Sequence, residues 1–176
     1  MKLYAAALAT ALATGLAVGA TTAAVAQANA FSDQDKTFLK NSAEDNLAEI
    51  KEGELVLKTT KNPQIRAFAQ KMITDHKALY AGEKPVAAKA GITLPTSPSV
   101  ESDATYLKLK VLTGDEFDKS YIKGAVSDHH GDATKAKEEH DTTQNADMKK
   151  LSAHAGAVIE THTKMADALA GKMGLQ

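Results

Sequence analysis

The stretch NPQIRAFAQKMITDHKAL, residues 62–79, has the pattern of an α-helix with one buried face. Its Asn62-Pro63 pair is typical of a helix start, because Asn caps free backbone N–H groups and Pro fits the first helical turn. Apolar side chains then recur every three or four residues, at Ile65, Phe68, Ala69, Met72 and Leu79. At roughly 100° per residue, His76 falls within about 30° of the centre of this stripe. The stretch therefore predicts an amphipathic helix that directs a histidine into a protein core.

The same helical periodicity recurs along most of the chain after residue 30. Long helices are expected over 33–60, 63–81, 115–140 and 145–172, with a short extra helix over 105–112 that contains Tyr106. We expect Gly82 and Pro85 to kink or end the second helix. No stretch alternates in the manner of a strand, so the predicted fold class is all-α.

The lengths of the connections predict how the helices pack. Only a few residues join the first helix to the second and the third to the fourth, so each pair should form an antiparallel hairpin. The middle connection, 82–114, is long enough to return along the molecule and make the second and third helices parallel. We therefore predict a ferritin-like up-down four-helix bundle with a long crossover between the second and third helices.

The first thirty residues, MKLYAAALATALATGLAVGATTAAVAQANA, differ in kind from the rest. One charge, Lys2, precedes an Ala-rich apolar run that ends in small residues. This pattern predicts a signal peptide over 1–28, cleaved after a residue between 26 and 30, followed by a helical domain over 31–173. An uncleaved anchor is the alternative, but a run so rich in Ala, Thr and Gly is weakly hydrophobic. We expect a periplasmic or secreted protein with no stable membrane insertion after cleavage.

Composition excludes several classes of site. The chain has no Cys, which rules out disulfides, thiolate metal sites and cysteine nucleophiles. It has 21 Lys and Arg against 22 Asp and Glu, and Arg66 is its sole arginine. Nucleic acid is therefore not an expected partner, because phosphate and base recognition depend on clustered Arg and Lys. No protein partner is indicated.

Two more histidines point inward by the same helical arithmetic. His129 lies on the apolar stripe of the third helix, and His162 lies on that of the fourth. His76 and His129 are nearly equally far from the starts of their helices, so parallel helices would place them level. Glu49 lies as far before the first turn as His76 lies after it. His162 fits less well, with an offset of about five residues or roughly 7 Å, unless the turn lies elsewhere or the side chains lean.

A faint internal repeat supports the match between His76 and His129. FAQKMITDH, residues 68–76, aligns with YIKGAVSDH, residues 121–129. Each copy begins with an aromatic residue and ends in Asp-His. The repeat predicts that the two helices contribute equivalent side chains to one region of the core.

Imidazole and carboxylate groups that converge from facing helices suit a transition metal, Zn, Cu, Mn or Fe. The predicted metal ligands are Glu49, His76, Asp118, His129 and His162, with Asp75, Tyr121 and Asp128 around them. The alternative is a buried polar network that holds the helices in register without a metal. Both interpretations use the same residues.

Catalytic chemistry finds little support in the sequence. Di-iron carboxylate bundles carry Glu-x-x-His on two helices, but Ile73, Val126 and Ile159 stand three residues before the three histidines. No nucleophile lies beside a base, so no catalytic residues are predicted. Two functions remain: an exported bundle that binds a transition metal, or a non-catalytic structural or interaction protein of the cell envelope.

Three segments in order carry a family resemblance: NLAEIKEGELVLKTTKNPQIRAFAQKMITDHKAL, AAKAGITLP and LTGDEFDKSYIKGAVSDH. They resemble a large bacterial family of exported proteins that is classed as a domain of unknown function. The resemblance implies a ferritin-like helical bundle and export, and it supplies no biochemical activity. The family pattern maps onto Glu49, Gly53, Met72, Asp75, His76, Gly91, Pro95, Gly114, Phe117, Asp118, Tyr121, Asp128, His129 and His162. The chain departs from that pattern around Gly82 to Pro85 and in the Gly- and His-rich segment after His129.

Overall fold

The computed structural model describes residues 30–175, and its described part is all-α with no strand. The signal peptide predicted over 1–28 lies outside the described residues. The helices are α2 (Asp33–Thr59), α3 (Pro63–Lys89), α4 (Val100–Lys110), α5 (Gly114–Thr142) and α6 (Ala146–Lys172). None of these five is both long enough and apolar enough to cross a membrane.

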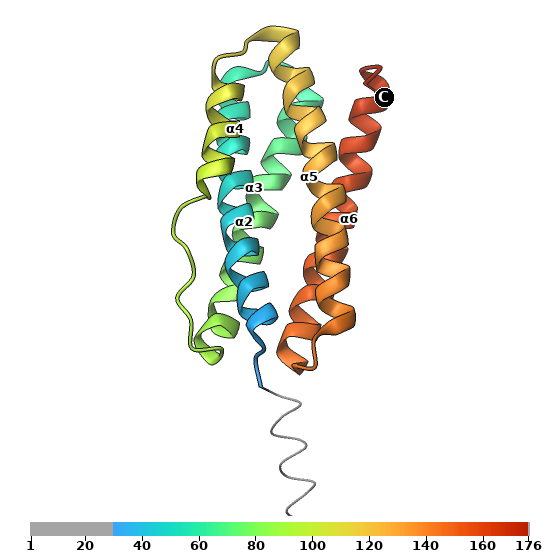
Figure 1. Cartoon of the computed structure of the whole chain (residues 1–176). Coiled ribbons are helices and arrows are strands. Elements are labelled where there is room, and N and C mark those ends of the chain that lie inside the picture. Colours follow the sequence, from blue (N-terminus) through green and yellow to red (C-terminus); the bar gives the residue numbers. More distant parts are fainter. Residues whose placement is uncertain (1–29, 176) are drawn as a thin grey trace, which may run out of the picture.

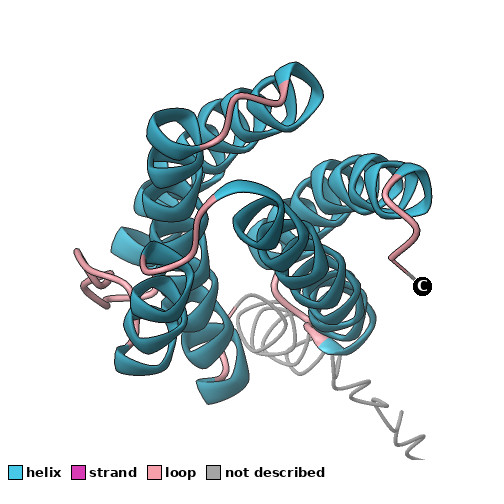
Figure 2. Cartoon of the chain, turned by 90° about the horizontal axis from the view of Figure 1, so that it is seen from above, coloured by secondary structure: helices cyan, strands magenta, loops and turns pink. Residues whose placement is uncertain are grey.

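The four long helices lie side by side as two hairpins, α2 with α3 and α5 with α6 (Figures 1 and 2). The helix α2 also packs against α5, and α3 also packs against α6. The segment between α3 and α5 returns along the outside of the molecule and carries α4, so α3 and α5 run in the same direction (Figure 1). Side chains from α3 and α5 therefore meet across the centre.

The helix α3 continues to Lys89, so the break predicted after residue 81 is wrong. Pro85 removes one backbone N–H and leaves the carbonyl of Ala81 without its helical partner. Both residues lie on the exposed side of the helix, where water can satisfy that carbonyl. The buried side, with Glu83 and Ala87, keeps the helix packed against its neighbours.

The short helix α4 begins at Val100, five residues before the predicted start. Ser99 caps it, because its hydroxyl oxygen accepts a hydrogen bond from the backbone N–H of Ser102. The helix lies against α2, where Lys51 Nζ is 2.7 Å from Asp103 Oδ1 and 4.3 Å from the centre of the Tyr106 ring. Leu109 is its one buried residue.

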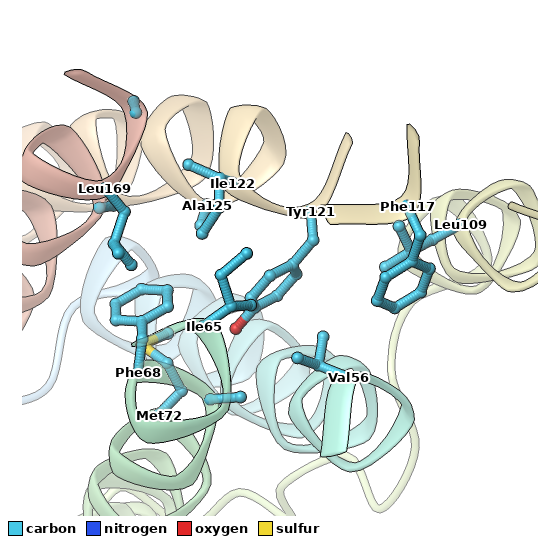
Figure 3. Packing of buried hydrophobic residues seen from close by; sticks show 13 residues of the cluster. Val56, Ile65, Phe68, Met72, Leu109, Phe117, Tyr121, Ile122, Ala125 and Leu169 are labelled. Carbon is cyan, nitrogen blue, oxygen red and sulfur yellow. The ribbon is translucent and has the colours of Figure 1, made fainter. Parts of the chain in front are cut away.

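The core has two unequal parts along its length. The larger apolar cluster includes Val56, Ile65, Phe68, Met72, Phe117, Tyr121 and Ile122, with Leu109 from α4 (Figure 3). The smaller cluster contains Leu79, Ala136, Ala155 and Ile159. Large side chains fill the first part, whereas alanines supply half of the second. His76, His129 and His162 lie between these two parts.

Candidate functional site

Three histidines from three helices meet inside the bundle. His76 of α3, His129 of α5 and His162 of α6 are at most 3% exposed. Their ring centres lie 5.2 to 5.7 Å apart. Each offers one ring nitrogen as a ligand, and the three nitrogens lie within 4.8 Å of one another. In the described part of the chain, this is the group of His, Cys, Asp and Glu residues that meets the geometry of a metal site.

One nitrogen of each ring is held by a hydrogen-bond acceptor. His76 Nδ1 lies 2.8 Å from Asn46 Oδ1, and His129 Nδ1 lies 2.8 Å from the carbonyl oxygen of Ala125. His162 Nε2 lies 2.8 Å from Asp75 Oδ2. Carbonyl and carboxylate oxygens only accept hydrogen bonds, so the proton of each neutral ring is on the bonded nitrogen.

The other nitrogen of each ring therefore carries a lone pair. These atoms, Nε2 of His76, Nε2 of His129 and Nδ1 of His162, are buried and have no hydrogen-bond partner among the described residues. Leaving one buried polar atom unpaired costs about 1–3 kcal/mol. Three such atoms in one place form a group of lone pairs that could bind a metal ion or accept hydrogen bonds.

Burial keeps the three rings neutral at neutral pH. It is the main cause that lowers the pKa of His76 well below its usual value, with the neighbouring histidines adding to the effect. Burial also lowers the pKa of His129 to about 4, and it lowers the pKa of His162 against the opposing pull of Asp75. Neutral imidazole is the form that binds a metal.

His162 reaches the other two histidines despite the offset expected from the sequence. Gln144 lies in the middle of the turn between α5 and α6, with His129 fifteen residues before it and His162 eighteen after it. The remaining offset is three residues, roughly 4.5 Å. Helical side chains lean toward the N-terminus of their own helix, so the two rings lean toward each other in this antiparallel pair.

Glu49, the fourth predicted ligand, lies behind His129. Its Oε1 is 3.8 Å from His129 Nδ1, the nitrogen bonded to Ala125 and not the unpartnered one. Burial, reinforced by the negative charges of Glu52 and Asp128, raises the pKa of Glu49 well above its usual value. The structure therefore does not bring this carboxyl group to the unpartnered nitrogens.

Asp118 also lies apart from the histidines. It is eleven residues before His129 on α5, roughly 16 Å along the helix. It lines a hollow beside the turn between α2 and α3, with Thr60 and Asn62. Asp118 was predicted as a ligand because it points to the same side of α5 as His129. Its distance along the helix keeps it away from the three histidines.

The three surrounding residues predicted from the sequence have different places. Asp75 contacts the cluster directly through His162. Tyr121 belongs to the larger apolar cluster, where its ring centre is 6.0 Å from that of Phe68. Asp128 is exposed on α5.

Sequence reasoning missed Asn46 and Glu83 as members of the site. The carboxamide of Asn46 accepts from His76 through Oδ1 and donates through Nδ2 to Glu83 Oε1, at 2.8 Å in both cases. Ser42 donates to the same Glu83 oxygen at 2.6 Å. The sequence did contain a signal for Asn46, which lies one turn from Glu49 on the buried face of α2. A polar side chain at a buried position needs a hydrogen-bond partner in the core.

The internal repeat is visible in the packing. The first residues of the two copies, Phe68 and Tyr121, lie side by side in the core (Figure 3). The last residues, His76 and His129, have ring centres 5.7 Å apart. The parallel course of α3 and α5 places equivalent positions opposite each other.

Comparisons with known proteins give a family and a similar fold, and they supply no activity. A search of curated proteins found no match. A crystal structure of a DUF305 fragment from Deinococcus radiodurans matches with a TM-score of 0.72 and 11% sequence identity, over 81% of this chain and 99% of that one. At this identity the likeness concerns the fold. The family described as "Domain of unknown function (DUF4142)" matches residues 20–169, so the chain belongs to that family.

Proposed function

We propose that this protein binds a single transition-metal ion, Zn²⁺ or Cu²⁺, through His76, His129 and His162. The observation that carries the proposal is the convergence of three buried imidazoles whose free nitrogens lack a partner. An all-imidazole set suits Zn and Cu, whereas Mn²⁺ prefers oxygen ligands. Zinc sites of three protein ligands keep a fourth position for another molecule.

The geometry is close to that of a loaded site. Zinc–nitrogen bonds of about 2.0–2.1 Å place tetrahedral ligand atoms roughly 3.3 Å apart. The three nitrogens here lie within 4.8 Å of one another. An ion would therefore need to shorten each distance between these nitrogens by at most about 1.5 Å. Asn46, Ala125 and Asp75 would hold the rings from outside, as hydrogen-bond acceptors commonly do for metal-bound histidines.

A buried polar network without a metal is the alternative function of these residues. Such a network is stable when every polar atom is paired. The three unpartnered nitrogens count against it, because a closed network would pair them with one another's protons. The metal hypothesis explains both the bonded and the free nitrogen of each ring.

Elemental analysis and metal titration test the proposal. Purified protein, stripped and reloaded with Zn²⁺ or Cu²⁺, should hold one equivalent per chain and melt at a higher temperature, because the ion binds the native state. His76→Ala and His162→Ala should lose the bound metal. His130→Ala is the matched control, since His130 is exposed beside His129. Retention of one equivalent by both core variants would refute the three-histidine site.

Two further proposals concern the whole protein. The apolar N-terminal pattern supports export to the periplasm or beyond, and N-terminal sequencing of the exported protein should find cleavage between residues 26 and 30. The paired hairpins and the long connection through α4 support membership of the ferritin-like bundles. The chain lacks the Glu-x-x-His pairs of di-iron proteins, so the proposed site holds one ion.

A further inference from the structure

A cavity of about 420 Å³ lies directly beside the histidine cluster. His76 and Asn46 form part of its wall. Each of the three metal-binding helices also contributes a residue one turn from its histidine: Leu79 on α3, Asp132 on α5 and Ile159 on α6. Because α6 runs opposite to α3 and α5, these three positions lie on the same side of the cluster (Figure 1).

The opposite side of the cluster is closed. Met72, Ala125 and Ala166 lie one turn from the three histidines in the other direction, and all three belong to the larger apolar cluster. They are at most 4% exposed. A metal held by the three rings would therefore have one packed side. Its other side would lie toward the cavity, whose wall includes His76 but neither His129 nor His162.

Small side chains create this cavity. Ala136 and Ala155 line it two turns from His129 and His162, at inward positions where the other half of the bundle carries aromatic and branched residues. Phe38, Leu79 and Ile159 complete an apolar inner wall. The volume falls within the range of about 300–1,000 Å³ typical of small-molecule sites.

The outer wall of the cavity is acidic. It carries Asp33, Asp45, Asp132 and Glu138, against one cation, Lys135. Lys135 Nζ is already engaged, at 3.4 Å from Asp45 Oδ2 and 2.9 Å from Asp132 Oδ1. This wall repels anions and leaves no free positive charge to receive a carboxylate or phosphate.

From these features we infer that the cavity admits a small, uncharged organic molecule whose nitrogen or sulfur donor atom completes the coordination of the proposed metal. The inference rests on the metal site of the proposed function. It assigns a ligand class: an apolar body that fits the inner wall, a lone-pair donor that reaches the ion, and no negative charge. The metal is then a binding centre that recognises a molecule, and not only a structural link between helices.

Nicotinamide and nicotinate are matched probes, because both carry a pyridine nitrogen on a ring of similar size and only nicotinate is negatively charged. The protein is loaded with Co²⁺, whose visible absorption responds to the number and kind of its ligands. We expect nicotinamide to change the spectrum with a saturable 1:1 isotherm. Nicotinate should bind at least about tenfold more weakly, a difference of about 1.4 kcal/mol.

Two variants fill the cavity from opposite walls without touching a histidine, Ala155→Leu on α6 and Ala136→Leu on α5. Each should weaken nicotinamide binding by about tenfold or more while Co²⁺ content stays at one equivalent. Ala157→Leu is the control, since Ala157 is exposed on α6. Thermal melts show whether each variant folds, and the two walls provide independent tests.

The outcomes separate the two proposals. Protein that takes up no Co²⁺, Zn²⁺ or Cu²⁺ would overturn both. Protein that holds one ion whose spectrum nicotinamide leaves unchanged, or changes equally in the filled variants, would overturn the cavity inference alone. Tighter binding of nicotinate than of nicotinamide would overturn the assigned ligand class.

Discussion

Asp75 precedes His76 in the chain, yet its carboxylate is hydrogen-bonded to His162 on the other hairpin, at 2.8 Å between Oδ2 and Nε2. The neighbouring positions on α3 thus serve two different rings. His76 supplies one face of the cluster, and Asp75 fixes the orientation and the proton of another. The same carboxylate is 2.8 Å from Lys71 Nζ. Asp75 and His76 therefore contribute to the same site although no hydrogen bond joins their side chains.

Replacing the carboxylate that orients His162 should weaken metal binding. In Asp75→Asn the side-chain amide can donate to Nε2, which moves the ring proton to Nδ1, the proposed ligand atom. We expect a loss of about 10- to 100-fold in Zn²⁺ affinity, measured by competition with a chelator. Asp167→Asn is the matched control, because Asp167 forms an exposed pair with His130 at 3.2 Å. Equal affinities of Asp75→Asn and the unmodified protein would remove Asp75 from the site.

Glu83 should make the metal-free protein less stable as pH rises. Burial raises its pKa to about 7, above the ordinary value of 4.5, so folding favours the protonated form. The associated stability is present below about pH 4.5 and is lost as pH rises through 7. Glu83→Gln keeps an oxygen acceptor for Ser42 and Asn46 without the charge. We expect it to match the unmodified protein at pH 5 and to gain roughly 3 kcal/mol at pH 8.

Urea denaturation at the two pH values measures this difference. Glu101→Gln is the control, because Glu101 is exposed at the start of α4. A gain of the same size at both pH values would mean that the titration of Glu83 is not its cause.

His129 should have the opposite pH dependence in the metal-free protein. Burial lowers its pKa to about 4 in the folded state, below the usual value of about 6.5. Above pH 6.5 the ring is neutral in both states, and between 6.5 and 4 only the unfolded chain takes up the proton. The free energy of unfolding should therefore decrease by about 1.4 kcal/mol for each unit by which the pH is lowered in this window.

In His129→Gln the slope of unfolding free energy against pH between 6.5 and 4 should be smaller by the contribution of one proton, because this residue no longer titrates. The slope is informative even where the variant is less stable at every pH. His130→Gln, which changes the exposed neighbour, should keep the original slope. An unchanged slope in His129→Gln would show that His129 takes up its proton in the folded state as readily as in the unfolded chain.

Gly53 lies where α2 packs tightly against α3. A Cβ atom there would lie 2.8 Å from Ile73 Cγ1 and 3.2 Å from the carbonyl oxygen of Ala69. Gly53→Ala should therefore destabilise the protein by about 1–3 kcal/mol. Gly82→Ala on α3 is the contrast, because its Cβ meets nothing within 4 Å, and it should stabilise the helix by roughly 0.5–1 kcal/mol. Thermal or urea unfolding of the two variants measures the difference, and an equal gain for both would refute the close packing.

Some features of the fold were accessible from local signals. Asn62 and Pro63 start α3 as predicted, with the Asn62 side chain accepting from two backbone N–H groups, because capping depends on neighbouring residues alone. Pro85 misled the prediction for the same reason. A proline removes a hydrogen bond wherever it stands, but its exposed position and the packing of Glu83 and Ala87 on the other face decide that the helix continues.

The candidate site divides along the same line. The periodicity of apolar residues was sufficient to predict that His76, His129 and His162 point inward, since direction around a helix follows from residue number. The packing of the helices against one another sets which polar groups reach these rings. Glu49 and Asp118 also point inward, but Glu49 lies beside the bonded nitrogen of His129 and Asp118 lies far along α5 from the histidines. Asn46 and Asp75 instead form the hydrogen bonds to the rings of His76 and His162 from other helices. Direction is a local property of a helix, and the height, lean and contacts of a side chain are set by how whole helices pack.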